Sequence, residues 1–295
     1  MVRQTVGICD VSTLGKIDIQ GPDAGTFLDR VYTNMFSTLK VGKVRYGLML
    51  REDGMVLDDG TTARLGENHF VMTTTTGAAG PVMSHLEFCS QCLWPELDVK
   101  MISVTEQWAQ IAIAGPKSRG LLAELIEGVS DESFPFMGCG EVSIAGATGR
   151  LFRISFSGEL AYEIAVPARY GAALMAEVVK RAETMGGGAY GMEALNVLRI
   201  EKGFLTHAEM DGRVTAADLG MAGMMSAKKD FVGKVSSQRD GLIDSMREQL
   251  VGIRPVGPVR QILGGSIMVE VDADPIRENM QGHVTSVCYS PTLER

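Results

Sequence analysis

A segment between residues 46 and 60 limits the possible folds more than any other part of the chain. It contains a short apolar stretch, Tyr46–Leu50, the turn sequence Arg51-Glu-Asp-Gly54, and a second apolar stretch that runs into Asp58 and Asp59. An Asp-Gly pair between two apolar runs is typical of a β-hairpin. Successive side chains on a strand point to opposite faces, so we expect one carboxylate to face the interior and the other to face solvent.

An inward-facing carboxylate on this hairpin is a candidate functional group. Such a group must be hydrogen-bonded or paired with a cation, or else its pKa must rise, because burial penalises the charged form. The alternative is that Asp58-Asp59-Gly60 is only the polar end of a strand. The hairpin alone does not decide between these two interpretations.

The size and composition indicate a globular chain with a sizeable core. The chain has 295 residues, of which 45% are hydrophobic, and this length suffices for one large domain or for roughly two to three packed subdomains. The net charge is −8 and no basic run stands out, which argues against nucleic acid as the main partner. We find neither an apolar run of membrane-spanning length nor a signal-peptide pattern, so a cytoplasmic location is expected.

The cysteines predict reduced thiols, because their number, five, is odd and no secretory signal precedes them. Cys89 and Cys92 form a Cys-x-x-Cys pair. A structural zinc usually needs two such pairs, and a thioredoxin-like site needs the pair to open a helix after a strand. Here the pair follows a stretch of helical character, and the sequence holds no second pair. We therefore expect no metal site and interpret the two thiols as lying near the end of a helix.

Hydroxyl groups and a glutamate at two further positions are also candidates. Thr73–Thr76 precede a helix expected over about residues 78–92, which their side chains could cap. Alternatively, a hydroxyl such as that of Thr75 contacts a polar heterocycle. Glu163 enters an otherwise apolar run. A carboxylate can accept two parallel N–H donors, so this glutamate is a candidate ligand-binding group.

A repeated pattern indicates an internal duplication. Gly21-Pro22 and Gly115-Pro116 each stand between a strand-like segment and a segment with helical spacing. This repetition predicts two related units of mixed helix and strand. From about residue 241 the pattern changes to short alternating segments, which we interpret as a small β-barrel.

Several segments resemble the glycine cleavage T-protein (aminomethyltransferase) family. Gly54-Met-Val-Leu-Asp58-Asp59 matches the family's Gly-x-x-x-Asp-Asp, and residues 153–163 are similar to its Arg-x-x-Tyr-Thr-Gly-Glu-x-Gly-Tyr-Glu. Residues 7–16, 61–77 and 104–109 are closer to one branch, the C-terminal, folate-binding half of the alpha subunit of heterotetrameric sarcosine oxidase. The resemblance covers nearly the whole chain.

The resemblance implies an α+β, T-protein-like folate-binding fold with two related α/β subdomains and a C-terminal β-barrel. We expect the folate-binding domain over residues 1–240, with a break near 115–135, and the barrel over 241–295. Family members continue with further strands, so the barrel is expected to be incomplete. The sarcosine oxidase subunit also has a preceding dinucleotide-binding region, whose Gly-x-Gly-x-x-Gly we do not find here. The chain is therefore expected to be a piece of a larger protein or a shortened relative.

The resemblance also implies a function. The chain would bind tetrahydrofolate, which accepts the one-carbon unit of oxidised sarcosine to give 5,10-methylenetetrahydrofolate. The segment match makes Asp59, rather than Asp58, the catalytic carboxylate beside the reacting folate nitrogens. The folate-binding residues that it implies are Tyr46, Thr75, Phe156, Tyr162 and Glu163. FAD, FMN and NAD would belong only to absent regions or to partner subunits.

A few positions depart from the family pattern. Phe156 stands where the glycine cleavage proteins usually carry Tyr, and Ala161 where they carry Gly. Leu195 replaces an arginine that would lie near the folate tail. We therefore expect Arg199 to form a structural pair with a carboxylate, and we interpret His207 as a surface or capping residue.

Other functions remain open at this point. The chain could be a stand-alone folate-dependent aminomethyltransferase or methyltransferase, a folate-binding module without turnover of its own, or a structural subunit that docks partners. The expected partners are a folate, a small amine-derived one-carbon donor and other sarcosine oxidase subunits. Neither nucleic acid nor membrane is expected.

Overall fold

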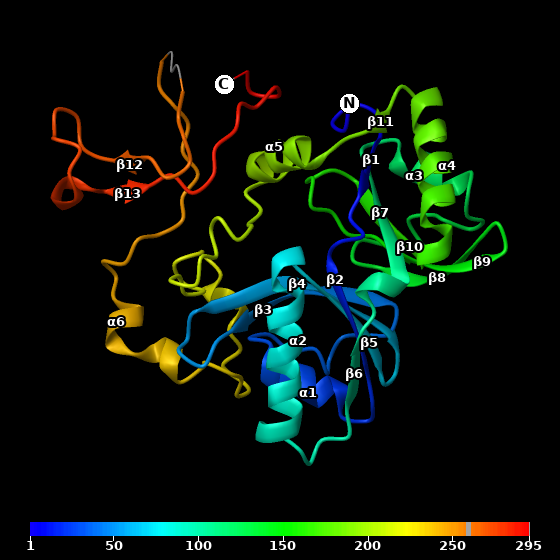
Figure 1. The fold of residues 1–295 in the computed structure, drawn as a ribbon, viewed down its shortest axis with the longest axis horizontal. Helices are drawn as coiled ribbons and strands as arrows, with labels where there is room; N and C mark the ends of the chain where they lie inside the picture. The colour runs from blue at the N-terminus through cyan, green and yellow to red at the C-terminus, as the bar shows by residue number, and fades with distance from the viewer. Residues whose placement is uncertain (258–260, 295) are drawn as a thin grey trace.

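Two β-sheets form the body of the molecule, and helices cover their outer faces (Figure 1). The computed structural model describes residues 1–257 and 261–294. One sheet has five strands and the other has six. An apolar cluster between the sheets contains Val44 and Ala63 from the first and Phe152 and Ala165 from the second. The two sheets therefore share an interior layer, which we call the inter-sheet layer.

The five-stranded sheet packs against helices α1 (Ala24–Val31) and α2 (Ala79–Phe88). Its strands, in spatial order, are β3 (Lys43–Leu50), β4 (Val56–Gly66), β5 (His69–Thr74), β2 (Gly15–Gln20) and β6 (Lys100–Ser103). Alternate residues such as Ile17 and Ile19 point toward the helices and are buried there. The residues between them point into the inter-sheet layer.

The six-stranded sheet packs against helices α3 (Ser118–Ala123) and α4 (Gly171–Thr184). Its strands, in spatial order, are β11 (Gly188–Ala189), β1 (Gly7–Asp10), β7 (Trp108–Ala114), β10 (Ala161–Pro167), β9 (Ala147–Phe152) and β8 (Cys139–Ile144). The chain crosses between the sheets after β1 and again after β6. In each half a strand, a Gly-Pro turn and a helix follow one another, as the repeated pattern predicts.

The predicted hairpin over residues 46–60 is confirmed as the β3–β4 pair. The Arg51 N–H donates to the Met55 carbonyl oxygen at 2.8 Å and closes the turn. Gly54 has φ +90°, a left-handed conformation that favours glycine, and an added Cβ would lie 2.6 Å from the Ser237 nitrogen. The turn is thus fixed both by backbone conformation and by a distant segment that packs on it.

A long irregular segment, residues 203–239, follows helix α5 (Met192–Lys202) and packs on the five-stranded sheet. The remaining regular elements are α6 (Asp240–Ile243), β12 (Ile267–Met268), β13 (Gly282–His283), the π-helix η2 (Cys89–Leu93) and the single turns η1 (Thr76–Ala78), η3 (Thr105–Gln107), η4 (Ala168–Tyr170), η5 (Ala222–Met224), η6 (Ser236–Gln238) and η7 (Arg277–Asn279). Within the described ranges, every helix is too short or too polar to cross a membrane.

The barrel expected over residues 241–295 is not closed in the part of this region that the structure describes. Only β12 and β13 pair there, through two residues of each strand. Apolar residues at the predicted strand positions are exposed, and Val271 is 91% exposed. A barrel needs strands that pair along both edges and bury one face, and the described residues meet neither condition.

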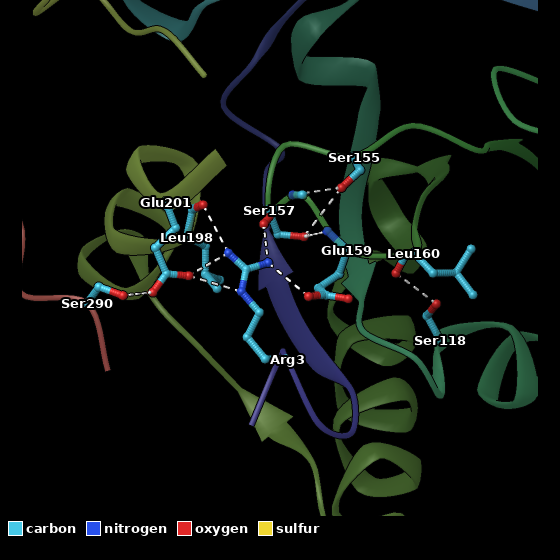
Figure 2. A network of polar contacts seen from close by, with 10 residues as sticks. Arg3, Ser118, Ser155, Ser157, Glu159, Leu160, Leu198, Glu201 and Ser290 are labelled. Carbon is cyan, nitrogen blue, oxygen red and sulfur yellow. Dashed lines mark hydrogen bonds and ion pairs between the residues drawn. The ribbon is translucent and has the colours of Figure 1, made fainter. Parts of the chain in front are cut away.

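A polar network joins residue 3 to α5 and to the C-terminal segment (Figure 2). The Arg3 guanidinium donates to the Glu201 carboxylate at 2.7 Å and to the Ser157 carbonyl oxygen at 2.6 Å. Ser290 Oγ donates to the other oxygen of Glu201 at 2.6 Å. Because Phe156 directly precedes Ser157, the network fixes the loop that carries Phe156 beside α5.

Candidate functional site

The catalytic candidate Asp59 lies on β4 and faces the inter-sheet layer. Asp59, Thr61 and Ala63 are alternate residues of one strand and so share a face. Ala63 belongs to the apolar cluster between the sheets. Tyr46 lies opposite Thr61 in the β3–β4 register and therefore shares this face. Strand pairing alone thus brings two of the predicted site residues together.

Asp59 and Tyr46 are joined by a hydrogen bond. Tyr46 Oη donates to Asp59 Oδ2 at 2.6 Å, and both side chains are partly buried. Burial raises the pKa of Asp59, and the bond from Tyr46 opposes this rise because it stabilises the carboxylate. Burial also raises the pKa of Tyr46, so the phenol remains a donor. A carboxyl group with a raised pKa and a fixed orientation is suited to proton transfer.

Asp58 is the fully buried member of the pair. Thr75 supplies two hydrogen bonds, from its backbone N–H to Oδ2 at 3.2 Å and from its hydroxyl to Oδ1 at 2.9 Å. Burial raises the pKa of Asp58 to about 6; the bonds from Thr75 oppose the rise, and the charge of Asp59 adds to it. One carboxylate therefore faces the interior, as expected, while Asp59 is itself only partly exposed.

His207 reaches this buried carboxylate from the 203–239 segment. Its Nε2 lies 2.6 Å from Thr75 Oγ1 and 3.7 Å from Asp58 Oδ1. The His207 side chain is 47% exposed, so the expected surface position is confirmed, but the contact with Thr75 was not expected. The hydroxyl of Thr75 caps no helix and instead connects Asp58 with His207.

The segment that carries His207 is held by a buried ion pair. Arg199 on α5 donates to Glu209 at 3.0 Å, and the two side chains are 5% and 4% exposed. Thr285 Oγ1 donates to Glu209 at 3.1 Å, and Arg199 also donates to Ser286 Oγ at 2.6 Å. The structural pair expected for Arg199 is therefore confirmed. Only one residue separates Glu209 from His207, so the pair restricts where the imidazole can lie.

Glu163 faces the same layer from the six-stranded sheet, because its alternate neighbour Ala165 belongs to the apolar cluster there. Gln110 on β7 donates from Nε2 to Glu163 Oε2. Burial raises the pKa of Glu163, and the bond from Gln110 and the charge of Lys16 oppose this rise. Across the described residues, Glu163 Oε1 has no hydrogen-bond donor, yet it is not an enclosed atom. One oxygen thus remains available to a ligand.

A small cavity lies between the two sheets, with a volume of about 10 Å³. Its walls include Lys16, Thr61, Thr73, Gln110, Arg150 and Phe152. This volume corresponds to roughly one water molecule and excludes an organic ring. Neither Asp59 nor Glu163 lines this cavity, so a larger ligand that contacts either carboxylate must reach it from outside the cavity.

Phe156 and Tyr162 occupy different surroundings. Tyr162 directly precedes Glu163, so its side chain points to the opposite face, where it is fully buried among the residues that pack under α3 and α4. Its hydroxyl accepts a hydrogen bond from Arg119 Nε at 2.8 Å. Phe156 is 37% exposed and stacks on Phe204, with the ring centroids 5.9 Å apart and an angle of 15° between the planes. Phe156 offers a flat apolar surface, whereas Tyr162 offers none.

Sequence reasoning missed Gln110 and the role of His207. Gln110 is the single strongly polar residue inside β7, and this isolated position is a signal that could have identified it. His207 and Thr75 are 132 residues apart, so no local spacing could have connected them. Contacts of this kind follow from the path of the whole chain.

The Cys-x-x-Cys pair lies at the end of α2, as expected. Cys89 is buried with its Sγ 3.6 Å from His85 Nε2, and Cys92 is exposed on the π-helix that extends α2. Across residues 1–257 and 261–294 we find no group of three or more His, Cys, Asp or Glu side chains that could hold a metal ion.

The fold is that of an aminomethyltransferase. It matches the crystal structure of glycine cleavage system aminomethyltransferase T from Bartonella henselae with a TM-score of 0.83, over 99% of this chain and 77% of that one, at 23% sequence identity. This likeness confirms the predicted α+β, T-protein-like fold. The family model described as the GCVT N-terminal domain matches residues 1–229. The chain belongs to the GCVT family.

The chain is similar over nearly its whole length to two kinds of protein in this family. Sarcosine oxidase subunit alpha from Rhizobium meliloti (strain 1021) is 55% identical over 294 residues, which cover 98% of this chain and 30% of the relative. The same subunit from Corynebacterium sp. (strain P-1) is 46% identical over 303 residues, or 100% of this chain and 31% of the relative. An aminomethyltransferase from Corynebacterium jeikeium (strain K411) is 29% identical, over 99% of this chain and 77% of that protein. The chain thus spans just under a third of its sarcosine oxidase relatives.

Proposed function

We propose that this chain binds tetrahydrofolate and transfers a one-carbon unit to it, as the folate-binding part of a sarcosine oxidase alpha subunit. The observation that carries the proposal is the pairing of Asp59 with Tyr46 on a surface that faces Glu163. The 55% identity to a sarcosine oxidase alpha subunit supports the same function. In this role the one-carbon unit comes from oxidised sarcosine, and the product is 5,10-methylenetetrahydrofolate.

Glu163 and Phe156 carry the chemical groups that a reduced pterin requires. Glu163 Oε1 has no donor among the described residues and can accept one N–H of an amino-pyrimidine edge, while Oε2, which already accepts from Gln110, has a second lone pair for the parallel N–H. Phe156 presents a flat, partly exposed ring on which a heterocycle can stack. We propose no direct folate contact for Thr75 or Tyr162, because their hydroxyls are bonded to protein groups.

Asp59 is the proposed catalytic residue. When a folate nitrogen attacks the one-carbon unit, a C–N bond forms and that nitrogen must lose a proton. Asp59 can accept this proton and return it to the departing amine, while Tyr46 holds the carboxylate in place. The carboxylate also stabilises the positive charge of an iminium donor as it approaches. The C–N bond to the amine breaks as the amine is protonated, the second folate nitrogen then bonds to the same carbon, and its proton leaves with the amine as an ammonium ion, so protons and charges balance without any further reactant.

Flavin and nicotinamide chemistry would belong to other regions or to partner subunits, which we propose dock with this chain. The proposed division places the folate-binding domain over residues 1–240, with a break near 115–135, and a second domain over 241–295. An alternative function is that of a stand-alone aminomethyltransferase. It is favoured by the 77% of such a relative that the chain covers, but the identity to that relative is only 29%.

Calorimetric titration of tetrahydrofolate into the 295-residue chain tests the proposal. The wild type is expected to bind, and Glu163→Gln to weaken binding roughly tenfold to a hundredfold, because a charge-assisted hydrogen bond is lost. Glu141→Gln, which changes an exposed glutamate on β8, is the matched control and should bind as the wild type does. Absence of wild-type binding would overturn the folate proposal. Equal binding by Glu163→Gln would overturn only the role of Glu163.

A further inference from the structure

Three side chains form a continuous hydrogen-bonded path from a buried carboxylate to solvent. Asp58 is fully buried, and Thr75 Oγ1 lies 2.9 Å from its Oδ1. The same hydroxyl lies 2.6 Å from Nε2 of His207, whose side chain is 47% exposed. The direct distance from His207 Nε2 to Asp58 Oδ1 is 3.7 Å, which is too long for a hydrogen bond, so the hydroxyl is a necessary link.

We propose that His207 and Thr75 form a proton relay through which the buried Asp58 exchanges its proton with solvent, so that Asp58 can adjust the charge beside Asp59. The second half of this proposal rests on the proposed catalytic role of Asp59. The relay itself rests only on the geometry. His207, Thr75 and Asp58 are positioning residues in this scheme, since none of them is placed against the substrate.

The relay balances as a simple proton shift. His207 takes a proton from hydronium at Nδ1 while its Nε2–H proton passes to Thr75 Oγ. Thr75 at the same time passes its own hydroxyl proton to Asp58 Oδ1. Hydronium becomes water, the carboxylate becomes a carboxylic acid, and the imidazole returns to neutral with its proton on the other nitrogen. Reversing these steps releases the proton from Asp58.

Among the titratable groups around Asp58, His207 is the one whose positive charge favours the ionised form of Asp58. Asp59 follows it on β4, and its negative charge disfavours ionisation of Asp58. Tyr46 and Tyr32 face the same carboxylates, but burial keeps both phenols neutral by raising their pKa. A positive charge on His207 favours the ionised forms of both Asp58 and Asp59. Loss of the positive charge on His207 should therefore change the ionisation of both carboxylates.

The first test needs no folate. Carboxyl ¹³C NMR titrations would follow Asp58 in the wild type, in His207→Gln and in His283→Gln, the last being a control histidine that pairs with Glu248. A glutamine at position 207 can still donate to Thr75 but cannot carry a positive charge. Asp58 is expected to titrate at a higher pH in His207→Gln and at the wild-type pH in His283→Gln. An unchanged titration in both variants would overturn the coupling.

The second test separates a relay from a purely structural link. With tetrahydrofolate and formaldehyde as probes, His207→Gln is expected to slow transfer roughly tenfold or more and to change its pH profile. Thr75→Val should slow it similarly, whereas Thr75→Ser, which keeps the hydroxyl, should stay within about twofold of the wild type. Added imidazole should restore rate to His207→Ala, because the exposed position leaves room for it.

Failure of the relay and failure of the proposed function look different in these experiments. A wild type that transfers normally, together with a His207→Gln variant that has the same rate and pH profile, would overturn the relay and leave the function standing. A wild type that shows no transfer above the uncatalysed reaction would overturn the function. In that case the NMR titration still decides whether His207 is coupled to Asp58.

Discussion

The surfaces of β4 and β10 both bury carboxylates, yet their partners differ in kind. On β4 the partners are hydroxyl groups and a histidine, which can give and take protons. On β10 the direct partner of Glu163 is the amide of Gln110, which donates a hydrogen bond but does not exchange protons near neutral pH. Burial raises the pKa on both sides. Burial therefore sets the affinity of a carboxylate for a proton, whereas the hydrogen-bond partners decide whether that proton can move.

Asp59→Asn should produce the largest loss of transfer rate. The loss should come from the proton chemistry at β4, and the binding of tetrahydrofolate should be nearly unchanged. Asparagine keeps the shape and can still accept the bond from Tyr46, but it cannot take up a proton. We expect transfer of the one-carbon unit to fall by about 10²–10⁴-fold, while tetrahydrofolate affinity stays within about threefold. Rate measurements and calorimetry on the same preparations check this. An unchanged rate would remove Asp59 from catalysis.

Arg199→Met should cause the largest loss of stability, because it leaves Glu209 buried without its ion pair. The free energy of unfolding, measured with urea, is expected to fall by about 3–5 kcal/mol. Arg213→Met breaks a pair whose arginine is largely exposed, and it should leave the unfolding midpoint nearly unchanged. Glu209 also restricts the position of the segment that carries His207. Any Arg199→Met protein that still folds should therefore lose proton transfer at β4 before it loses ligand binding at β10. Equal effects of the two substitutions would contradict this account.

Asp58 should add a pH dependence to stability whose sign can be derived. Its pKa of about 6 in the folded state lies above the value of about 3.9 in an unfolded chain. Between these values the folded state binds a proton that the unfolded state lacks, so this contribution to stability grows as the pH falls from about 7 to about 4. The difference approaches about 3 kcal/mol at most.

Urea unfolding of the wild type and of Asp58→Asn measures this contribution directly. The wild type should gain stability relative to the variant between pH 7 and pH 4.5, because only the wild type takes up the proton. Glu163→Gln provides the same comparison for β10, where burial raises the pKa too. A wild-type advantage that does not change with pH would show that the Asp58 carboxyl does not titrate in this range.

Phe156→Leu should give the smallest effect and should affect binding alone. Loss of an aromatic stack costs about 0.5–1.5 kcal/mol, which weakens tetrahydrofolate binding by about two- to tenfold. The rate at saturating folate should not change. Phe136→Leu, at a ring that is 71% exposed, is the matched control and should have no effect. A slower saturated rate in Phe156→Leu would mean that the ring also orients the reacting atoms.

Local rules predicted the parts of the molecule that depend on neighbouring residues. The Asp-Gly turn predicted the β3–β4 hairpin, and alternation along β4 predicted one inward carboxylate. The same alternation, applied to β10, would have placed Tyr162 and Glu163 on opposite faces. The family motif grouped the two as folate contacts, whereas the structure separates them. Adjacent residues on a strand point to opposite faces, so of these two only Glu163 faces the inter-sheet layer.

Long-range pairing could not be predicted from local pattern. The strand β1 joins the six-stranded sheet, although the next strand in the chain lies in the other sheet. His207 approaches Thr75 only because residues 203–239 pack back onto the five-stranded sheet. In the C-terminal region, alternation predicted the strands of a barrel, but the described residues form only the short strands β12 and β13, because alternation supplies no partner edge. Most of those segments remain unpaired in the described part of the chain.

The small volume between the sheets has a consequence for motion. The cavity lined by both sheets holds about one water molecule, so admitting a ring there would require the sheets to separate and lose close contacts. The carboxylates of β4 and β10 therefore lie on closely packed sheets that resist rearrangement. We expect any opening and closing around a bound ligand to take place in the peripheral segments, above all residues 203–239 and the loop of Phe156. In such a molecule, access to the carboxylates is expected to follow loop motions on a timescale of roughly microseconds to milliseconds, while the sheets keep their arrangement.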